Sequence, residues 1–173
     1  DNDMTDIAQT HDQKTSWQGC VVSLHSCSAK SEPMGTYETL SCKAGVGIEG
    51  DRYTLETGTY SARPEEGRQI TLFESETLEA LSRDHGITLQ PDQTRRNVIT
   101  RGAPLNHLVG RKFRIGNQVV VEGMRYCAPC QYLEDLLEVK TLFKALINRG
   151  GLNCRILDSG IIAPGDIIVP LDN

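Results

Sequence analysis

The chain has 173 residues, 38% of them hydrophobic, and a formal net charge of −5 from 18 basic and 23 acidic residues. This length suffices for one domain with its own core, and the acidic balance excludes a general attraction to nucleic acid or anionic membranes. No apolar run is long enough to cross a bilayer and the N-terminus has no signal-peptide pattern, so we expect a soluble, cytoplasmic protein. Its six cysteines are expected to be mostly free thiols.

Residues 1–16 are polar and predict a disordered leader, whereas residues 17–173 predict a single domain. Alternating segments bounded by glycine-containing turns predict strands at 19–25, 37–44, 69–73, 96–100, 112–115, 118–122, 153–157 and 166–169, with a hairpin turn at 115–118. Helical leucine spacing predicts helices at 75–84, beginning with the cap-like Ser75, at 131–138 and at 141–148. Short strands joined by tight turns predict a mainly β fold, a β-barrel with a few short covering helices.

The segment MRYCAPC, residues 124–130, contains a Cys-x-x-Cys pair, Cys127 and Cys130, that is compatible with several roles. A thioredoxin-like disulfide belongs at the start of a helix in an early strand and helix unit, whereas this pair follows a hairpin late in the chain. A structural zinc site needs four ligands, and the other cysteines and histidines are scattered. Two small buried residues at a junction between a loop and a helix are the plain alternative. The residues alone leave these alternatives open.

Three segments combine arginine with glycine or asparagine and could hold an anion. In residues 45–52, GVGIEGDR, the glycines allow backbone N–H groups to approach a ligand, and Arg52 adds a guanidinium. Arg95, Arg96 and Asn97 open a predicted strand; because neighbouring strand residues face opposite sides, only one of the two arginines is expected to enter a shared site. The third segment is NRGG, residues 148–151. Each of the three is equally compatible with a solvated turn.

One ordered set of short segments runs through the chain: AKS (29–31), GIEGDRY (47–53), RQITLFESETLEAL (68–81), RRNVITRGAPLNHLVGRKFRIG (95–116), RYCAPCQYLE (125–134), RGGLNCRIL (149–157) and GIIAPGDIIV (160–169). In number, order and spacing these segments resemble the MOSC domain, the module named for the C-terminal domain of molybdenum-cofactor sulfurase. The resemblance extends from about Trp17 to Val169. It implies a mainly β, barrel-like fold. It also implies a pocket for the molybdenum cofactor, a pterin that carries a phosphate and a dithiolene that chelates the metal.

The resemblance also implies cofactor-binding residues. Lys30 and Ser31 match a Lys-Ser pair that contacts the cofactor in amidoxime-reducing members of the family. Arg52 matches the arginine that ends a Gly-x-x-Gly-Asp-Arg element. Arg95 and Asn97 match an Arg-x-Asn element, in agreement with the expectation that residues 95 and 97 of a strand share a face.

Cys130 matches the thiolate that ligates molybdenum, and the resemblance makes it both the metal ligand and the catalytic residue. Cys127 matches a cysteine that some members carry without using it as the ligand. Ala128 replaces a residue that can be serine in the amidoxime reducers, which removes a possible hydroxyl contact. The larger reductases also carry an additional N-terminal β domain, for which nothing before Trp17 provides a counterpart. No site for pyridoxal phosphate, flavin or haem is evident.

The leading hypothesis is therefore a molybdenum-cofactor oxidoreductase of the small bacterial type that reduces N-hydroxylated small molecules. A separate flavin or iron–sulfur protein would supply the electrons, because the chain has no electron-transfer motif of its own. A second hypothesis is a sulfur carrier in which Cys130 or Cys127 holds a persulfide for an acceptor. A third is a cofactor-binding module without turnover. No nucleic-acid or membrane partner is expected.

Overall fold

The computed structural model describes residues 16–55, 66–128, 131–138 and 141–171. The strands within these ranges are β1 (Gly19–Ser26), β2 (Gly35–Tyr37), β3 (Leu40–Lys43), β4 (Gly47–Ile48), β5 (Ile70–Glu74), β6 (Val98–Arg101), β7 (Lys112–Ile115), β8 (Val119–Tyr126), β9 (Leu152–Asp158), β10 (Gly160–Ile162) and β11 (Ile167–Pro170). The α-helices are α1 (Ser75–His85), α2 (Gln131–Leu137) and α3 (Leu142–Ala145), and short 3-10 helices are η1 (Glu66–Arg68), η2 (Pro91–Thr94) and η3 (Leu105–His107).

Seven of the strands close into a barrel. They follow the order β11-β7-β8-β9-β5-β6-β1, and β11 pairs back onto β1 to complete the circle. The closing pairs are Gly19 with Ile168 and Cys20 with Ile167. All neighbouring pairs are antiparallel except β5 and β6, which are parallel and are joined through α1. The predicted mainly β fold, a barrel with a few short helices, is therefore confirmed.

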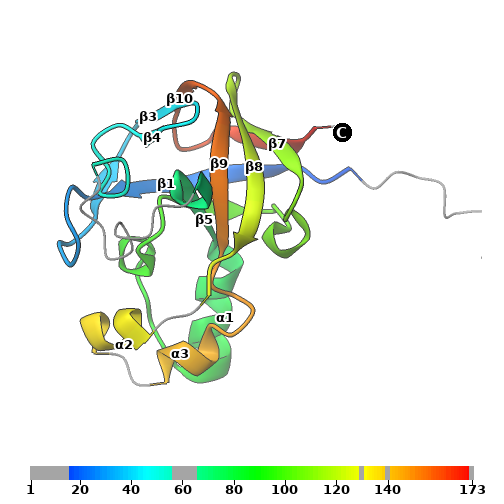
Figure 1. Cartoon of the computed structure of the whole chain (residues 1–173). Helices are drawn as coiled ribbons and strands as arrows, with labels where there is room; N and C mark the ends of the chain where they lie inside the picture. Colours follow the sequence, from blue (N-terminus) through cyan, green and yellow to red (C-terminus); the bar gives the residue numbers. More distant parts are fainter. Residues whose placement is uncertain (1–15, 56–65, 129–130, 139–140, 172–173) are drawn as a thin grey trace, which may run out of the picture.

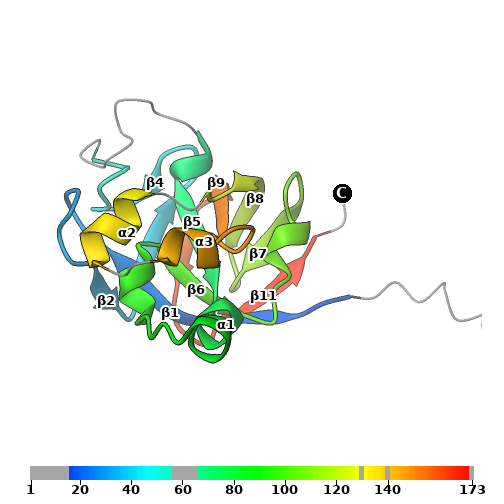
Figure 2. The ribbon, with the colours of Figure 1, turned by 90° about the horizontal axis from the view of Figure 1, so that it is seen from below.

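The helices gather at one end of the barrel, and a second sheet lies toward the other (Figure 1). The second sheet has the order β10-β3-β4. Seen from the helical end, α2 and α3 lie in front of the barrel strands, with α1 beside them (Figure 2). No helix in the described part of the chain is long and apolar enough to cross a membrane.

Two hydrophobic clusters hold this arrangement together. The larger fills the barrel with residues such as Leu24, Leu72 and Phe113, each fully buried. The smaller lies between the barrel wall and the helices, where Phe73 meets Leu146 of the segment that follows α3. Leu72 and Phe73 are strand neighbours that face opposite sides, so β5 contributes to both clusters.

The sequence located most elements to within a few residues, including the 115–118 turn between β7 and β8. One detail was wrong: Ser75 is the first residue of α1 rather than its cap, and Glu74 occupies the cap position without a capping side-chain hydrogen bond. The predicted strand at 37–44 is interrupted between β2 and β3, and the short strands β4 and β10 were not predicted. These two strands contribute only two and three residues, too few to show an alternating pattern.

Candidate functional site

A cavity of about 340 Å³ lies against the outer face of the barrel wall. Its described lining contains five arginines and no carboxylate: the residues are Arg52, Tyr53, Arg68, Thr71, Arg95, Arg96, Arg125, Tyr126, Cys127, Ala128 and Asn153. We call it the arginine cavity. In a chain with a net charge of −5, this cluster of arginines is a local feature that favours an anionic ligand, because clustered guanidinium groups attract phosphate and carboxylate.

The floor of the arginine cavity is a row of residues on three adjacent strands. Thr71 of β5 is the register partner of Asn153 of β9, and Asn153 is also the partner of Arg125 of β8. Directly opposed residues on neighbouring strands face the same side. The neighbours of Thr71, Ile70 and Leu72, belong to the barrel core, so this row faces outward. The barrel therefore holds the floor of the cavity in a fixed register.

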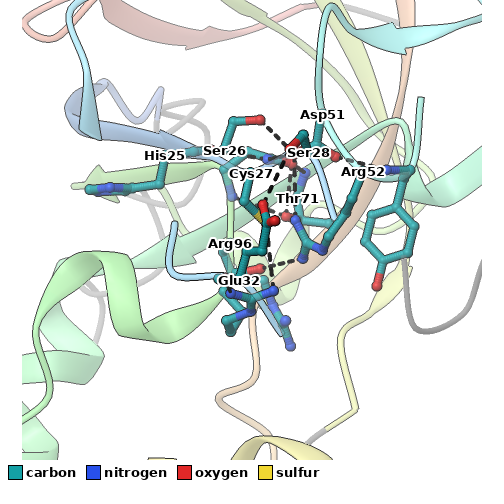
Figure 3. Close-up of polar contacts among 12 residues, drawn as sticks. His25, Ser26, Cys27, Ser28, Glu32, Asp51, Arg52, Thr71 and Arg96 are labelled. Carbon is teal, nitrogen blue, oxygen red and sulfur yellow. Dashed lines mark hydrogen bonds and ion pairs between the residues drawn. The ribbon is translucent and has the colours of Figure 1, made fainter. Parts of the chain in front are cut away.

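A buried carboxylate anchors the loop that supplies Arg52. Asp51 is 1% exposed and its Oδ1 accepts hydrogen bonds from the Ser26 hydroxyl at 2.7 Å and from Arg52 at 3.4 Å. Its Oδ2 accepts from the backbone N–H of Tyr53 at 3.1 Å. Figure 3 shows Asp51 between Ser26 and Arg52. Asp51 therefore fixes both the loop and the guanidinium, as a positioning residue rather than as an acid or base.

Arg52 is held by contacts on several sides. Its backbone N–H donates to the Cys27 carbonyl at 2.7 Å and its Nη2 donates to the Arg95 carbonyl at 3.1 Å. Its guanidinium carbon also lies 4.5 Å from the centroid of the Tyr53 ring, in cation–π geometry. Arg52 is only 4% exposed. Such contacts preorganise the guanidinium before any ligand arrives.

Asn97 ties the same loop to the barrel. Its Oδ1 accepts from the backbone N–H and the hydroxyl of Thr71, both at 3.1 Å. Its Nδ2 donates to the His25 carbonyl at 3.1 Å and to Asp51 at 3.2 Å. These four hydrogen bonds use the full capacity of a primary amide, and Asn97 is 1% exposed. It lies behind the cavity lining and has no group left for a ligand.

Arg95 and Arg96 both line the cavity, which corrects the expectation that only one of them enters the site. The strand β6 begins at Val98, and Arg95 has a left-handed backbone with φ of 63° at the end of η2. This conformation breaks the alternation on which the expectation rested. Arg95 is 6% exposed and donates to the Glu32 carbonyl and, at 3.5 Å, to the Cys27 sulfur. Arg96 donates to the Gly150 carbonyl at 3.1 Å.

Cys127 is a buried cysteine at the wall of the cavity. Burial raises its pKa, and the nearby guanidinium groups of Arg96 and Arg125 only partly oppose that effect. Its Sγ donates a hydrogen bond to Asn153 Oδ1 at 3.2 Å, which also requires the protonated form. The described cysteines, Cys127 among them, are free thiols, as predicted. No group of three or more potential metal ligands occurs in the described ranges.

The remaining residues expected from the sequence fall in different places. Lys30 is exposed, and it is not among the described residues that line the arginine cavity. Ser31 has a left-handed backbone and lines a separate cavity of about 330 Å³. Arg95 lines both cavities, whereas Ser31 is not among the described residues that line the arginine cavity. Cys130 lies outside the described residues, so its role as a metal ligand stays a prediction.

The structure also identifies lining residues that the sequence did not single out. Arg68 ends the 3-10 helix η1 immediately before β5, and Thr71 and Asn153 belong to the floor. Their signal was faint: a polar residue between core residues on a predicted strand marks a face that is not core. His25 takes no part, because its imidazole points away from Asp51 and Arg52 (Figure 3) and bonds to the Ser23 and Thr36 hydroxyls instead.

The MOSC domain matches residues 54–169, more than half of the chain. The chain belongs to the MOSC domain family. This family is associated with binding of the molybdenum cofactor. The matched range includes Arg68, Arg95, Arg96 and Arg125 of the arginine cavity, whereas Arg52 lies just before it. A comparison with curated proteins finds no match.

Solved structures share the fold across most of the chain. The YuaD protein of Bacillus subtilis superposes with a TM-score of 0.76 at 18% identity, covering 91% of this chain and 100% of its own. YiiM from Geobacillus stearothermophilus gives 0.69 at 16% identity, covering 89% of this chain and 75% of its own. YiiM from Escherichia coli gives 0.63 at 14% identity, with 91% and 70% covered. At these low identities the likeness shows the fold alone. The superpositions cover 89–91% of this chain, so the shared fold also includes residues before position 54, where the family match begins.

Proposed function

We propose that this MOSC protein binds the molybdenum cofactor in the arginine cavity and uses it to reduce N-hydroxylated small molecules. The observation that carries the proposal is the cavity itself, whose described lining has five arginines and no carboxylate. Guanidinium groups bind phosphate through paired, charge-assisted hydrogen bonds, and the cofactor carries a phosphate. A volume of about 340 Å³ is within the usual range for cofactor and ligand pockets.

The residues present fit the parts of this cofactor. The arginines would hold the phosphate, and Arg52 and Arg95 are already fixed by contacts to backbone carbonyls. The rings of Tyr53 and Tyr126 provide flat surfaces beside a pterin, and Thr71 and Asn153 provide polar groups for its edge. Ala128 lines the cavity, and Cys130 comes two residues later in the sequence. The thiolate of Cys130 is the proposed metal ligand, because soft sulfur ligands suit molybdenum.

When bound, the metal would supply the redox chemistry for the reduction. Reduction of an N-hydroxy group breaks the N–O bond, consumes electrons and protons in equal number, and releases water. A separate flavin or iron–sulfur protein would deliver the electrons. The protein's own contribution is to bind and orient, with Asp51 bonded to Arg52 and Asn97 bonded to Asp51.

The sulfur-carrier alternative is weakened at Cys127. Persulfide chemistry begins with a thiolate, whereas burial raises the pKa of the Cys127 thiol, and the thiol donates a hydrogen bond to Asn153 Oδ1. The alternative therefore depends on Cys130. Incubation with a cysteine desulfurase followed by mass spectrometry distinguishes the two functions, because a reducible adduct of one sulfur atom on metal-free protein favours the carrier.

The deciding experiment measures molybdenum and pterin in protein made in a host that synthesises the cofactor. We expect both in the wild type and in Cys20→Ser, a matched control on β1 outside the cavity lining. We expect Cys130→Ser to lose metal and activity toward an amidoxime with an artificial electron donor. Wild-type protein with neither molybdenum nor pterin would refute cofactor binding. Protein that holds the cofactor but reduces no N-hydroxylated compound would be a binding module.

A further inference from the structure

A second pocket adjoins the arginine cavity and differs from it in chemistry. It has a volume of about 440 Å³ and is lined by Asn106, Tyr126, Cys127, Ala128, Ile147 and Asn148. We call it the neutral pocket. Tyr126, Cys127 and Ala128 line both spaces, so one short segment forms their common wall.

The described lining of the neutral pocket contains no charged side chain. Its lining includes two large apolar side chains, Tyr126 and Ile147, which are 55% and 52% exposed. Large apolar side chains left in solvent at the mouth of a pocket favour a ligand that covers them. A charged ligand would lose hydration here without gaining a partner. The pocket therefore favours an uncharged molecule with an apolar, flat face.

Hydrogen bonds fix the rim of the neutral pocket. The Tyr126 hydroxyl donates to the Asn106 carbonyl at 3.0 Å, and Asn106 Nδ2 donates to the Asn148 carbonyl at 2.7 Å. Asn148 has a left-handed backbone, with φ of 63°. These bonds join the end of β8, the 3-10 helix η3 and the turn after α3, so the pocket is formed without a ligand. No described residue donates a hydrogen bond to Asn106 Oδ1, which leaves this atom as an acceptor for a ligand N–H or O–H.

We propose that the neutral pocket binds the uncharged aromatic body of the substrate, with the reducible group toward the wall formed by Cys127 and Ala128. This inference rests on the proposed function and adds the substrate class. The two sites therefore differ in the charge of the ligand that they bind: the arginine cavity binds the anionic cofactor, and the neutral pocket binds the uncharged substrate. An anionic substrate would instead be drawn to the arginines, where it would compete with the cofactor phosphate.

A charge placed in the neutral pocket tests the assignment. Ile147→Asp puts a carboxylate at a position that is half exposed, so folding is not at risk. Ile161→Asp on β10 is the matched control, since Ile161 is 64% exposed and does not line the pocket. The substrates are benzamidoxime, its 4-carboxylate and its 4-aminomethyl analogue, which are neutral, anionic and cationic.

For Ile147→Asp we expect the KM of benzamidoxime to rise about tenfold, and kcat to change less, because binding rather than chemistry is affected. The preference should also shift toward the cationic analogue, a gain that simple damage to the pocket cannot produce. Ile161→Asp should match the wild type. Equal KM values and an unchanged charge preference in Ile147→Asp, with normal molybdenum content, would overturn the inference and leave the proposed function intact.

Direct binding separates the inference from the proposed function. Saturation-transfer NMR can detect benzamidoxime on protein whether or not it contains cofactor. A dissociation constant about tenfold higher for Ile147→Asp than for the wild type and Ile161→Asp, obtained from the dependence of the signal on benzamidoxime concentration, would support the neutral pocket even if no molybdenum or turnover were found. Equal binding by all three proteins would overturn it.

Discussion

The side chains of Asp51 and Asn97 are 46 positions apart in the chain and are joined by a buried hydrogen bond of 3.2 Å between Oδ1 and Nδ2. Each is 1% exposed, and neither Asp51 nor Asn97 lines the arginine cavity. Through this bond the loop that carries Arg52 is attached to the strands that form the floor. Arg52 is therefore oriented by groups that lie outside the described lining of the cavity.

Asn97→Ala should cost about 3 kcal/mol of unfolding free energy, because it removes four buried side-chain hydrogen bonds, to Thr71, His25 and Asp51. Denaturant unfolding measures the change. Asn117→Ala, at an exposed turn between β7 and β8, should cost less than about 0.5 kcal/mol. If the two variants unfolded alike, the bonds of Asn97 would not contribute to stability.

Removing one guanidinium from the cavity should weaken cofactor retention. For Arg125→Gln and Arg68→Gln we expect a loss of about tenfold in affinity each, since a hydrogen bond to a charged group contributes about 1.5–3 kcal/mol. Molybdenum content after dialysis is the measurement. Arg83→Gln changes an exposed arginine paired with Asp84 on α1 and should retain the wild-type content. Full retention in both cavity variants would place the phosphate elsewhere.

The thiol of Cys127 should react slowly with iodoacetamide at neutral pH, because burial raises its pKa and the neutral thiol is a poor nucleophile. Two other cysteines of the chain serve as references. Burial raises the pKa of Cys42 to about 12, so Cys42 should also be slow, whereas Cys20 is partly exposed and should react faster. Peptide mass spectrometry over time gives the rates. Rapid modification of Cys127 would indicate a thiolate and would revive it as a sulfur carrier.

The stability of the protein should fall as the pH falls below about 6.5. Burial lowers the pKa of His25 from its ordinary value of 6.5, and the opposing effect of Asp92 is smaller. Between the lowered folded pKa and 6.5, the unfolded chain binds a proton that the folded protein does not, so acid favours unfolding there. Unfolding free energies measured from about pH 7.5 to pH 5.5 should decline more steeply for the wild type than for His25→Asn.

His85→Asn is the control for this titration, because His85 is exposed at the end of α1. It should keep the wild-type slope. An NMR titration that places the His25 pKa at or above 6.5 would contradict the prediction.

Much of the fold could be predicted from the sequence because its signals are local. Alternation located β7 and β9, and leucine spacing located α1 and α3, since both patterns follow from which side chains must be buried. The left-handed backbone of Arg95 carries no such signal. This backbone conformation lets both Arg95 and Arg96 reach the cavity. It depends on how the chain packs around η2, which a local sequence pattern does not encode.

The part of the site that local motifs encode could also be predicted from the sequence. Arg52 and Arg95 line the cavity, and motif matching was enough to select them. Asn97 was selected too, but its amide is used within the protein, which depends on partners 26 and 46 positions away. Arg68 begins one of the segments that resemble the MOSC domain, but the resemblance assigns it no role, because its place in the site depends on the short helix η1 before β5.

The closing pair of the barrel joins residues 19 and 20 to residues 167 and 168. Such distant contacts form slowly, because the intervening chain must first be ordered, and until then the edges of β1 and β11 are open to unwanted partners. Around the barrel, three strands separate β9 from this seam on each side: β8, β7 and β11 on one side and β5, β6 and β1 on the other. A local fluctuation that separates β1 from β11 can therefore leave β8, β9 and β5, the three strands beneath the arginine cavity, paired. The barrel can open at this position without disturbing the floor of the cavity.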